Sequence, residues 1–136
     1  HIESDVGPDG HSDADVLIHA LMDAMLGAAG LRDIGYYFPP EDDQYKGISS
    51  LLLLGKVNSL LKERGFEAYN IDIMVISETP KLKPHIDTMK ANLQSVLGIP
   101  LDRISIKATT NEMLGAIGRR EGIAAQAVVS VYEGEV

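Results

Sequence analysis

Hydrophobic residues recur with a helical period in the first quarter of the chain. Leu17 and Leu21 fall on one face together with further apolar residues, and the pattern continues to Gly30, where glycine supplies a stop signal. Asp13 or Asp15 precedes the periodic run, and either side chain is expected to cap the helix. The pattern therefore predicts an amphipathic helix that ends at about residue 30.

Two further helices are predicted from the same period. One opens at Ser49 or Ser50, presents a leucine-rich face and closes at Gly65. The other begins with Pro84 in its first turn and stops at Gly98. Both segments need a hydrophobic surface to pack against, which indicates a layered fold.

Strict alternation of apolar and polar residues predicts strands over residues 71–75, 104–108 and 123–131. A strand, a helix and a strand follow one another between about residues 70 and 109, which is the order of a right-handed parallel crossover. We therefore expect an α/β fold in which helices pack on one face of a sheet, formed as a single domain over residues 1–136.

The first predicted helix carries a polar stripe of chemical interest. Asp15, His19 and Asp23 are spaced four apart, so a helix sets the imidazole between two carboxylates, with His11 and Ser12 near its start. Such a stripe suits a metal ligand or a proton-transfer group, because a metal-bound histidine commonly donates its other ring proton to a carboxylate. A solvated polar face is the alternative, and the spacing alone leaves both open.

Residues 31–47 carry turn signals instead of periodicity and are predicted to form a loop. Within it Asp33, Ile34 and Gly35 place a carboxylate before a flexible glycine, and Phe38 precedes two prolines. Asp33 could accept hydrogen bonds from a polyol or cap the turn, and the capping interpretation is favoured.

Two polar segments follow the ends of the predicted parallel strands. Lys81 and Lys83 follow the first strand, and Thr109, Thr110 and Glu112 follow the second. Ligands of α/β sheets bind beyond the carboxyl ends of such strands. Ammonium groups, hydroxyl donors and a cation-binding carboxylate would together suit a phosphate, although the lysines could equally be ordinary loop charges.

A glycine-rich connection carries Arg119 and Arg120 between Gly115 and Gly122. It is not a P-loop, because the lysine and hydroxyl residue that must follow the glycines are missing. A hairpin with solvated arginines and a guanidinium that contacts phosphate remain equal alternatives.

Composition narrows the classes of partner. Of the 136 residues, 45% are hydrophobic and none is cysteine, which excludes disulfides and thiolate metal sites. The net charge of −8 argues against nucleic acid as a partner. No apolar stretch reaches membrane-spanning length and no secretory leader opens the chain, so we expect a cytoplasmic protein without membrane association.

Three ordered motifs resemble those of a known family. They read HSDADVLIHALMDAMLGAAGLRDIGYYFP, TPKLKPHI and IKATTNEMLGAIGRREGIAAQAV, and together they span nearly the whole chain. The sequence resembles the 2-C-methyl-D-erythritol 2,4-cyclodiphosphate synthases of the non-mevalonate isoprenoid pathway. A member of this family would lie in the cytoplasm, or in the plastid of a plant or alga.

The resemblance implies a cyclisation of 4-diphosphocytidyl-2-C-methyl-D-erythritol 2-phosphate. The 2-phosphate attacks the β-phosphorus, CMP leaves and a cyclic diphosphate forms. The family holds Zn²⁺ through an Asp-x-His pair and the histidine that matches His19, with Asp15 or Asp23 as the support we expect for its ring. A second cation, Mg²⁺ or Mn²⁺, is implied at Glu112. Such ions position and neutralise phosphates.

The resemblance also implies roles for residues in all three motifs. His11 and Thr110 are catalytic and stabilise the transition state. The remaining substrate-binding residues are Ser12 and Thr109 at phosphate, Asp33 and Gly35 at the methylerythritol hydroxyls, Lys81 and Leu82 in the cytidine loop, Arg119 near the substrate, and Ile34, Phe38 and Asp42.

Family members are homotrimers that share each active site between subunits and enclose an apolar cavity for isoprenoid diphosphates. This sequence departs from the pattern because the strand with the Asp-x-His pair is missing, so we expect weak zinc affinity and little activity of the 136 residues alone. Ala116 replaces a frequent phenylalanine and Pro40 a frequent acid. A zinc-dependent phosphoester hydrolase and a non-catalytic trimeric module that binds nucleotides or isoprenoid diphosphates are the alternatives.

Overall fold

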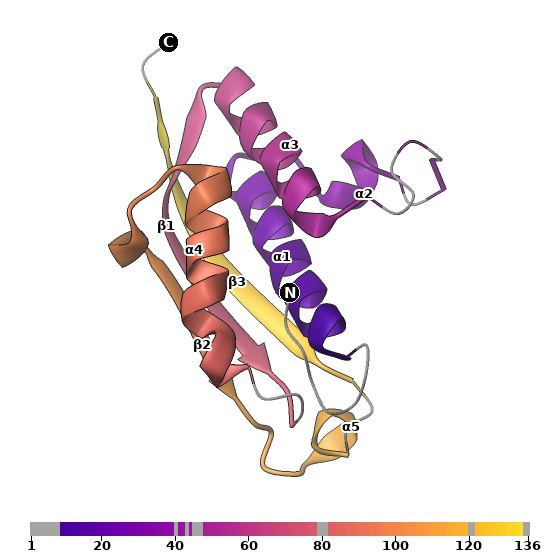
Figure 1. The fold of residues 1–136 in the computed structure, drawn as a ribbon. Coiled ribbons are helices and arrows are strands. Elements are labelled where there is room, and N and C mark those ends of the chain that lie inside the picture. Colours follow the sequence, from indigo (N-terminus) through magenta and orange to yellow (C-terminus); the bar gives the residue numbers. More distant parts are fainter. Residues whose placement is uncertain are drawn as a thin grey trace.

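The computed structural model describes residues 9–39, 41, 42, 44, 48–78, 82–119 and 122–134, and of residues 9–13 it describes the backbone alone (Figure 1). Three helices come first, and strands and helices alternate after them. In order they are α1 (Asp9–Ala28), α2 (Ile34–Tyr37), α3 (Ser50–Glu63), β1 (Phe66–Ile76), α4 (Ile86–Leu97), β2 (Ile104–Thr109), α5 (Gly115–Gly118) and β3 (Ala124–Glu133), with 3₁₀ turns at Lys83–His85 and Leu101–Arg103.

The described strands form a sheet in the order β2-β1-β3. β1 pairs parallel with β2, and Ile76 faces Thr109 where both strands end; β3 pairs antiparallel with β1. The predicted parallel crossover is therefore confirmed. β1 begins at Phe66, earlier than the alternation predicted, because an irregularity in the register between Ala68 and Asn70 interrupts the period of two.

Helices α1, α3 and α4 cover one face of this sheet, as predicted (Figure 1). Ile71 and Ile73 of β1 point into that face and are fully buried, and Leu17 and Leu21 of α1 pack in the same core. On β3 the side chain of Val128 is 72% exposed. Its face of the sheet is thus open in the single chain.

The ends of the helices follow from local signals. After α1, Gly30 adopts a φ of 72° and the N–H of Leu31 donates to the carbonyl of Leu26 at 2.8 Å, which is a Schellman ending. Ser49 caps α3 by accepting from Leu52 N–H at 3.2 Å. Gly98, with a φ of 70°, ends α4. These three boundaries agree with the sequence predictions.

The predicted start of α1 is wrong. The helix begins at Asp9, so Asp13 and Asp15 lie inside it and neither caps its first turn. Asp15 instead accepts a hydrogen bond from the hydroxyl of Ser50 at 2.7 Å, which connects α1 to the start of α3. A polar residue before an apolar run resembles a cap in sequence even when the helix extends further back.

The predicted loop over residues 31–47 contains the short helix α2, and this prediction is corrected as well. Asp33 stands at the N-cap position but its side chain makes no capping bond. Asp23 of α1 supplies the acceptor, with its Oδ1 2.9 Å from the Ile34 nitrogen. The favoured capping role of Asp33 is therefore wrong. Among the described helices, none is long and apolar enough to cross a membrane.

Candidate active site

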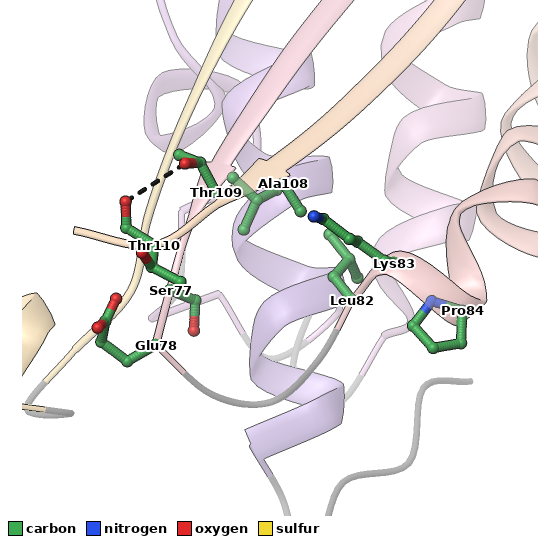
Figure 2. A pocket seen from close by; sticks show the side chains of 9 residues that line it. Ser77, Glu78, Leu82, Lys83, Pro84, Ala108, Thr109 and Thr110 are labelled. Carbon is green, nitrogen blue, oxygen red and sulfur yellow. Dashed lines mark hydrogen bonds between the residues drawn. The ribbon is translucent and has the colours of Figure 1, made fainter. Parts of the chain in front are cut away.

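A pocket of about 510 Å³ lies where β1 and β2 end (Figure 2), a volume typical of small-molecule sites. Ser77 and Glu78 line it after β1, and Thr109 and Thr110 line it at the end of β2. The N–H of Ser77 donates to the carbonyl of Thr109 at 3.0 Å, so the parallel pairing continues past the last residue of β1. Two motifs far apart in sequence thereby meet in one pocket.

The opposite wall of the pocket comes from the start of the α4 region. Leu82 is only 3% exposed and forms an apolar floor, and Lys83 and Pro84 stand beside it (Figure 2). Lys81, which was predicted for the same loop, lies outside the described residues. An apolar floor with a primary amine at one side and hydroxyls at the other suits a ligand with a flat ring and an anionic group.

The hydroxyl groups at the end of β2 belong to a short hydrogen-bonded chain. Thr109 donates from Oγ1 to the carbonyl of Thr110 at 3.4 Å, and the Oγ1 of Thr110 accepts from the N–H of Glu112 at 3.2 Å. Because it accepts from the backbone, the Thr110 hydroxyl keeps its own proton to donate to a ligand. The Glu112 side chain is exposed.

The segment after Thr110 has an unusual backbone. Glu112 and Met113 adopt φ values of 52° and 63°, in the left-handed region that side-chain-bearing residues seldom occupy. Glu78 accepts two backbone hydrogen bonds from this segment, from Asn111 at 2.7 Å and from Met113 at 3.0 Å. The contact connects the ends of both parallel strands.

The polar stripe of α1 is divided between two structural contacts. Asp15 binds Ser50 and Asp23 binds the backbone of α2, whereas His19 lies exposed between them. His11 belongs to the first turns of α1, and its side chain, like that of Ser12, is outside the description. The start of α1 lies toward the same end of the molecule as the carboxyl ends of β1 and β2 (Figure 1).

The residues predicted around α2 do not reach this pocket within one chain. Asp33 and Gly35 are exposed on α2, and Phe38 lines a separate groove of about 630 Å³ together with residues of α3. Asp42 accepts from both the backbone and side-chain nitrogens of Gln44 at 3.1 Å, which places it in a local turn. Ile34, the first residue of α2, is half-buried.

Arg119 closes the helix α5, and its N–H donates to the carbonyl of Gly115 at 3.0 Å. Of the two alternatives for this connection, the hairpin is wrong, because residues 115–118 form a short helix. The close approach of Gly118 to Met113 packs that helix against the Glu112 segment. No three histidine, aspartate or glutamate side chains converge within the described part of the chain. A complete metal site is therefore not formed by these residues alone.

Comparison with known proteins identifies the family. The model of the YgbB family matches residues 1–132. The chain belongs to the YgbB family. The resemblance predicted from the three motifs is thereby confirmed, and it covers both walls of the pocket.

Relatives of this YgbB chain carry one activity in their names. The 2-C-methyl-D-erythritol 2,4-cyclodiphosphate synthase of Thermosynechococcus vestitus is 59% identical over 125 residues, which are 92% of this chain and 78% of that relative. The enzyme of the same name from Akkermansia muciniphila is 56% identical over 131 residues, or 96% of this chain and 78% of the relative. These names agree with the predicted cyclase.

Solved structures share the fold of this YgbB chain. The bifunctional IspDF from Campylobacter jejuni matches with a TM-score of 0.83 and 45% identity over 87% of this chain, which is 32% of that larger protein. The CDP complex of IspF from Plasmodium falciparum matches with a TM-score of 0.77 and 30% identity, over 88% of this chain and 72% of the other.

One residue of the pocket received no role from the sequence. Glu78 appears in the polar segment after β1, but nothing local distinguishes it from a surface acid. The signal that could have identified it is topological: parallel neighbours end side by side, so an acid just beyond one strand faces the backbone N–H groups just beyond the other.

Proposed function

We propose that this YgbB chain converts 4-diphosphocytidyl-2-C-methyl-D-erythritol 2-phosphate into 2-C-methyl-D-erythritol 2,4-cyclodiphosphate and CMP. An oxygen of the 2-phosphate attacks the β-phosphorus, the bond from that phosphorus to the oxygen of the α-phosphate breaks, and CMP leaves with the electron pair. The observation that carries the proposal is the pocket in which the segments after β1 and β2 meet, found in a chain whose relatives bear this enzyme's name.

The pocket suits the cytidine and diphosphate portions of this substrate. The floor at Leu82 is apolar enough for the base, and Lys81 belongs to the same segment. Thr109 and Thr110 provide hydroxyl groups beside it. We assign transition-state stabilisation to Thr110 and to His11, because hydrogen-bond donors aimed at developing charge are a major source of rate enhancement in phosphoryl transfer.

The methylerythritol portion is assigned to α2 and its neighbours. Asp33 and Gly35 are exposed there, and Ile34, Phe38 and Asp42 flank them. Ser12 and Arg119 are assigned to phosphate. Because α2 lies apart from the pocket at the strand ends (Figure 1), we propose that the two groups meet across an interface between copies of the chain in a homotrimer, whose axial cavity would accept an isoprenoid diphosphate.

The two implied metals fit the described residues unequally. Glu112 presents an exposed carboxylate near the threonines, and a hard cation such as Mg²⁺ or Mn²⁺ is commonly bound by one carboxylate plus substrate phosphates. When bound, that ion would neutralise diphosphate charge. Zinc needs more than His19, since protein sites use three or four protein ligands and no such group forms among the described residues. His19 is therefore proposed as one ligand of a larger set, and no step is assigned to zinc.

Product analysis tests the proposed reaction. Incubation of a version that also carries the Asp-x-His segment with the cytidylyl substrate, Zn²⁺ and Mn²⁺ is expected to release CMP and a cyclic diphosphate, which phosphorus NMR distinguishes from a linear product. A linear product would indicate a hydrolase, and binding of CDP without turnover would indicate a non-catalytic module.

Matched variants localise the activity to the pocket. Thr110→Val removes a hydroxyl donor while keeping side-chain volume, and we expect kcat to fall by about 10²-fold. Thr88→Val makes the same change on the exposed surface of α4 and should keep wild-type turnover. Equal turnover of both variants would contradict the role of Thr110.

A further inference from the structure

The carboxylate of Glu78 is bound by the backbone of a distant segment. Its Oε2 accepts from Asn111 N–H at 2.7 Å and its Oε1 accepts from Met113 N–H at 3.0 Å. Both oxygens are thus used, one on each side of Glu112. In Figure 2, Glu78 lies on the Thr110 side of the pocket, across from Lys83 and Pro84.

This contact holds a backbone that is unfavourable by itself. Left-handed φ values at Glu112 and Met113 are unfavourable for residues that carry a side chain unless the surroundings fix them. Asn111 contributes a local bond from its side-chain nitrogen to the carbonyl of Leu114 at 2.7 Å, which closes the turn on itself. Glu78 differs from Asn111 because it connects the turn to a distant segment, the end of β1.

Such a turn has the geometry of an anion-binding nest. Successive N–H groups near left-handed residues form concavities that bind phosphate or carboxylate. Here the occupant is Glu78, so the N–H groups of Asn111 and Met113 are not available to a substrate phosphate. The groups left to face the substrate are the Thr110 hydroxyl, to which the N–H of Glu112 donates at 3.2 Å, and the Glu112 carboxylate.

We propose that Glu78 is a positioning residue that sets the Thr110 hydroxyl and the Glu112 carboxylate for a cation-bound diphosphate. The proposal rests on the function proposed above. Glu78 acts through hydrogen-bond acceptance and not through charge, because the two backbone N–H donors require lone pairs at two points. A negative charge near the diphosphate would by itself oppose binding.

Three variants separate these possibilities. Glu78→Ala removes both acceptors, and Glu78→Gln keeps one acceptor oxygen but turns an amide NH₂ group toward the other backbone N–H. Glu133→Gln makes the same charge change at an exposed site at the end of β3. We expect Glu78→Ala to lower Mn²⁺ affinity in the presence of CDP, and kcat, by about 10–100-fold, as for other partners that orient metal ligands. Glu78→Gln should cause a smaller loss of both, because one of the two hydrogen bonds remains, and Glu133→Gln should match wild type.

The readouts are the free Mn²⁺ signal in electron paramagnetic resonance, amide hydrogen exchange at Asn111 and Met113, and the division of the kinetic effect between kcat and KM. Faster exchange at both amides in Glu78→Ala together with weakened Mn²⁺ binding supports the proposal. Wild-type Mn²⁺ affinity in a folded Glu78→Ala, or unchanged exchange of both amides in that variant, overturns it. Failure of a version that also carries the Asp-x-His segment to form cyclic product, although it binds Mn²⁺ and CDP, refutes the proposed function, while the exchange and Mn²⁺ measurements still decide the role of Glu78.

Discussion

Replacement of Gly118 by alanine tests the packing that fixes the Glu112 segment. A Cβ atom at this position would lie 2.0 Å from the carbonyl carbon of Met113 and 2.5 Å from its Cα, whereas ordinary contact begins at 3.4 Å. The obstruction is backbone, so no side-chain rotation relieves it. The Met113 backbone would have to retreat by more than 1 Å, and Glu112 would move with it.

The expected magnitudes follow from that displacement. Overpacking of this kind costs about 1–3 kcal/mol in the free energy of unfolding. A catalytic group displaced by roughly 1 Å commonly costs about 10²-fold in rate. We therefore expect Gly118→Ala to lower the melting temperature and to reduce kcat for CMP release by about two orders of magnitude at a temperature at which circular dichroism shows the variant folded.

A neighbouring glycine supplies the control. A Cβ at Gly122 meets nothing within 4 Å, so Gly122→Ala should retain wild-type melting and turnover. Equal melting temperature and kcat of Gly118→Ala and Gly122→Ala would refute the proposed packing of Gly118 against Met113. The link from that packing to turnover is refuted if Gly118→Ala loses stability but keeps full turnover per folded molecule, because the position of Glu112 would then not depend on Met113.

Three further outcomes are expected. Asp23→Ala should lower the free energy of unfolding by about 1 kcal/mol, because α2 loses the acceptor of its first N–H. Asp33→Ala should raise KM without changing the stability measured by calorimetry, and the reverse pattern would contradict both assignments. The hydrogen bond that Tyr132 donates to Glu67 raises the pKa of the phenol above 10.0. The stability contributed by this bond is complete below pH 10 and is lost as pH rises through the raised pKa, so denaturant titrations should show an alkaline loss in wild type and not in Tyr132→Phe. Val128→Glu should dissociate the proposed trimer in sedimentation velocity, and a variant that sediments as wild type would place the interface elsewhere.

The parts of the fold that the sequence predicted correctly depend on local physics. Gly30 and Gly98 end helices because each adopts a left-handed backbone, and Ser49 caps α3 within its own first turn. The parts that it missed depend on distant partners. α2 is held by an acceptor eleven residues earlier at Asp23, and the register irregularity near Ala68 hides the first half of β1.

In the candidate site, too, the features set by local or topological rules were predictable and the features set by distant partners were not. The rule that ligands bind beyond parallel strand ends predicts from the sequence alone that Thr109 and Thr110 line the pocket. It could not show that Glu78 supports the turn after them, because that bond spans 33 residues. Nor could it show that Glu112 has a left-handed backbone, since glutamate carries no local preference for one.

The separation of the two groups proposed to bind the substrate would make assembly of several chains a requirement for the reaction. α2 is fixed to α1 by the 2.9 Å bond from Ile34 to Asp23, so Asp33 has little freedom to move toward Thr110 of the same chain. One substrate can then contact both groups only if they come from different copies, and the open sheet face at Val128 is the surface that a neighbour would cover. Turnover per chain should therefore fall on dilution in step with dissociation, because a dissociated chain retains its pocket but lacks the second half of the site. Constant turnover per chain across that dilution would show that one copy binds the whole substrate.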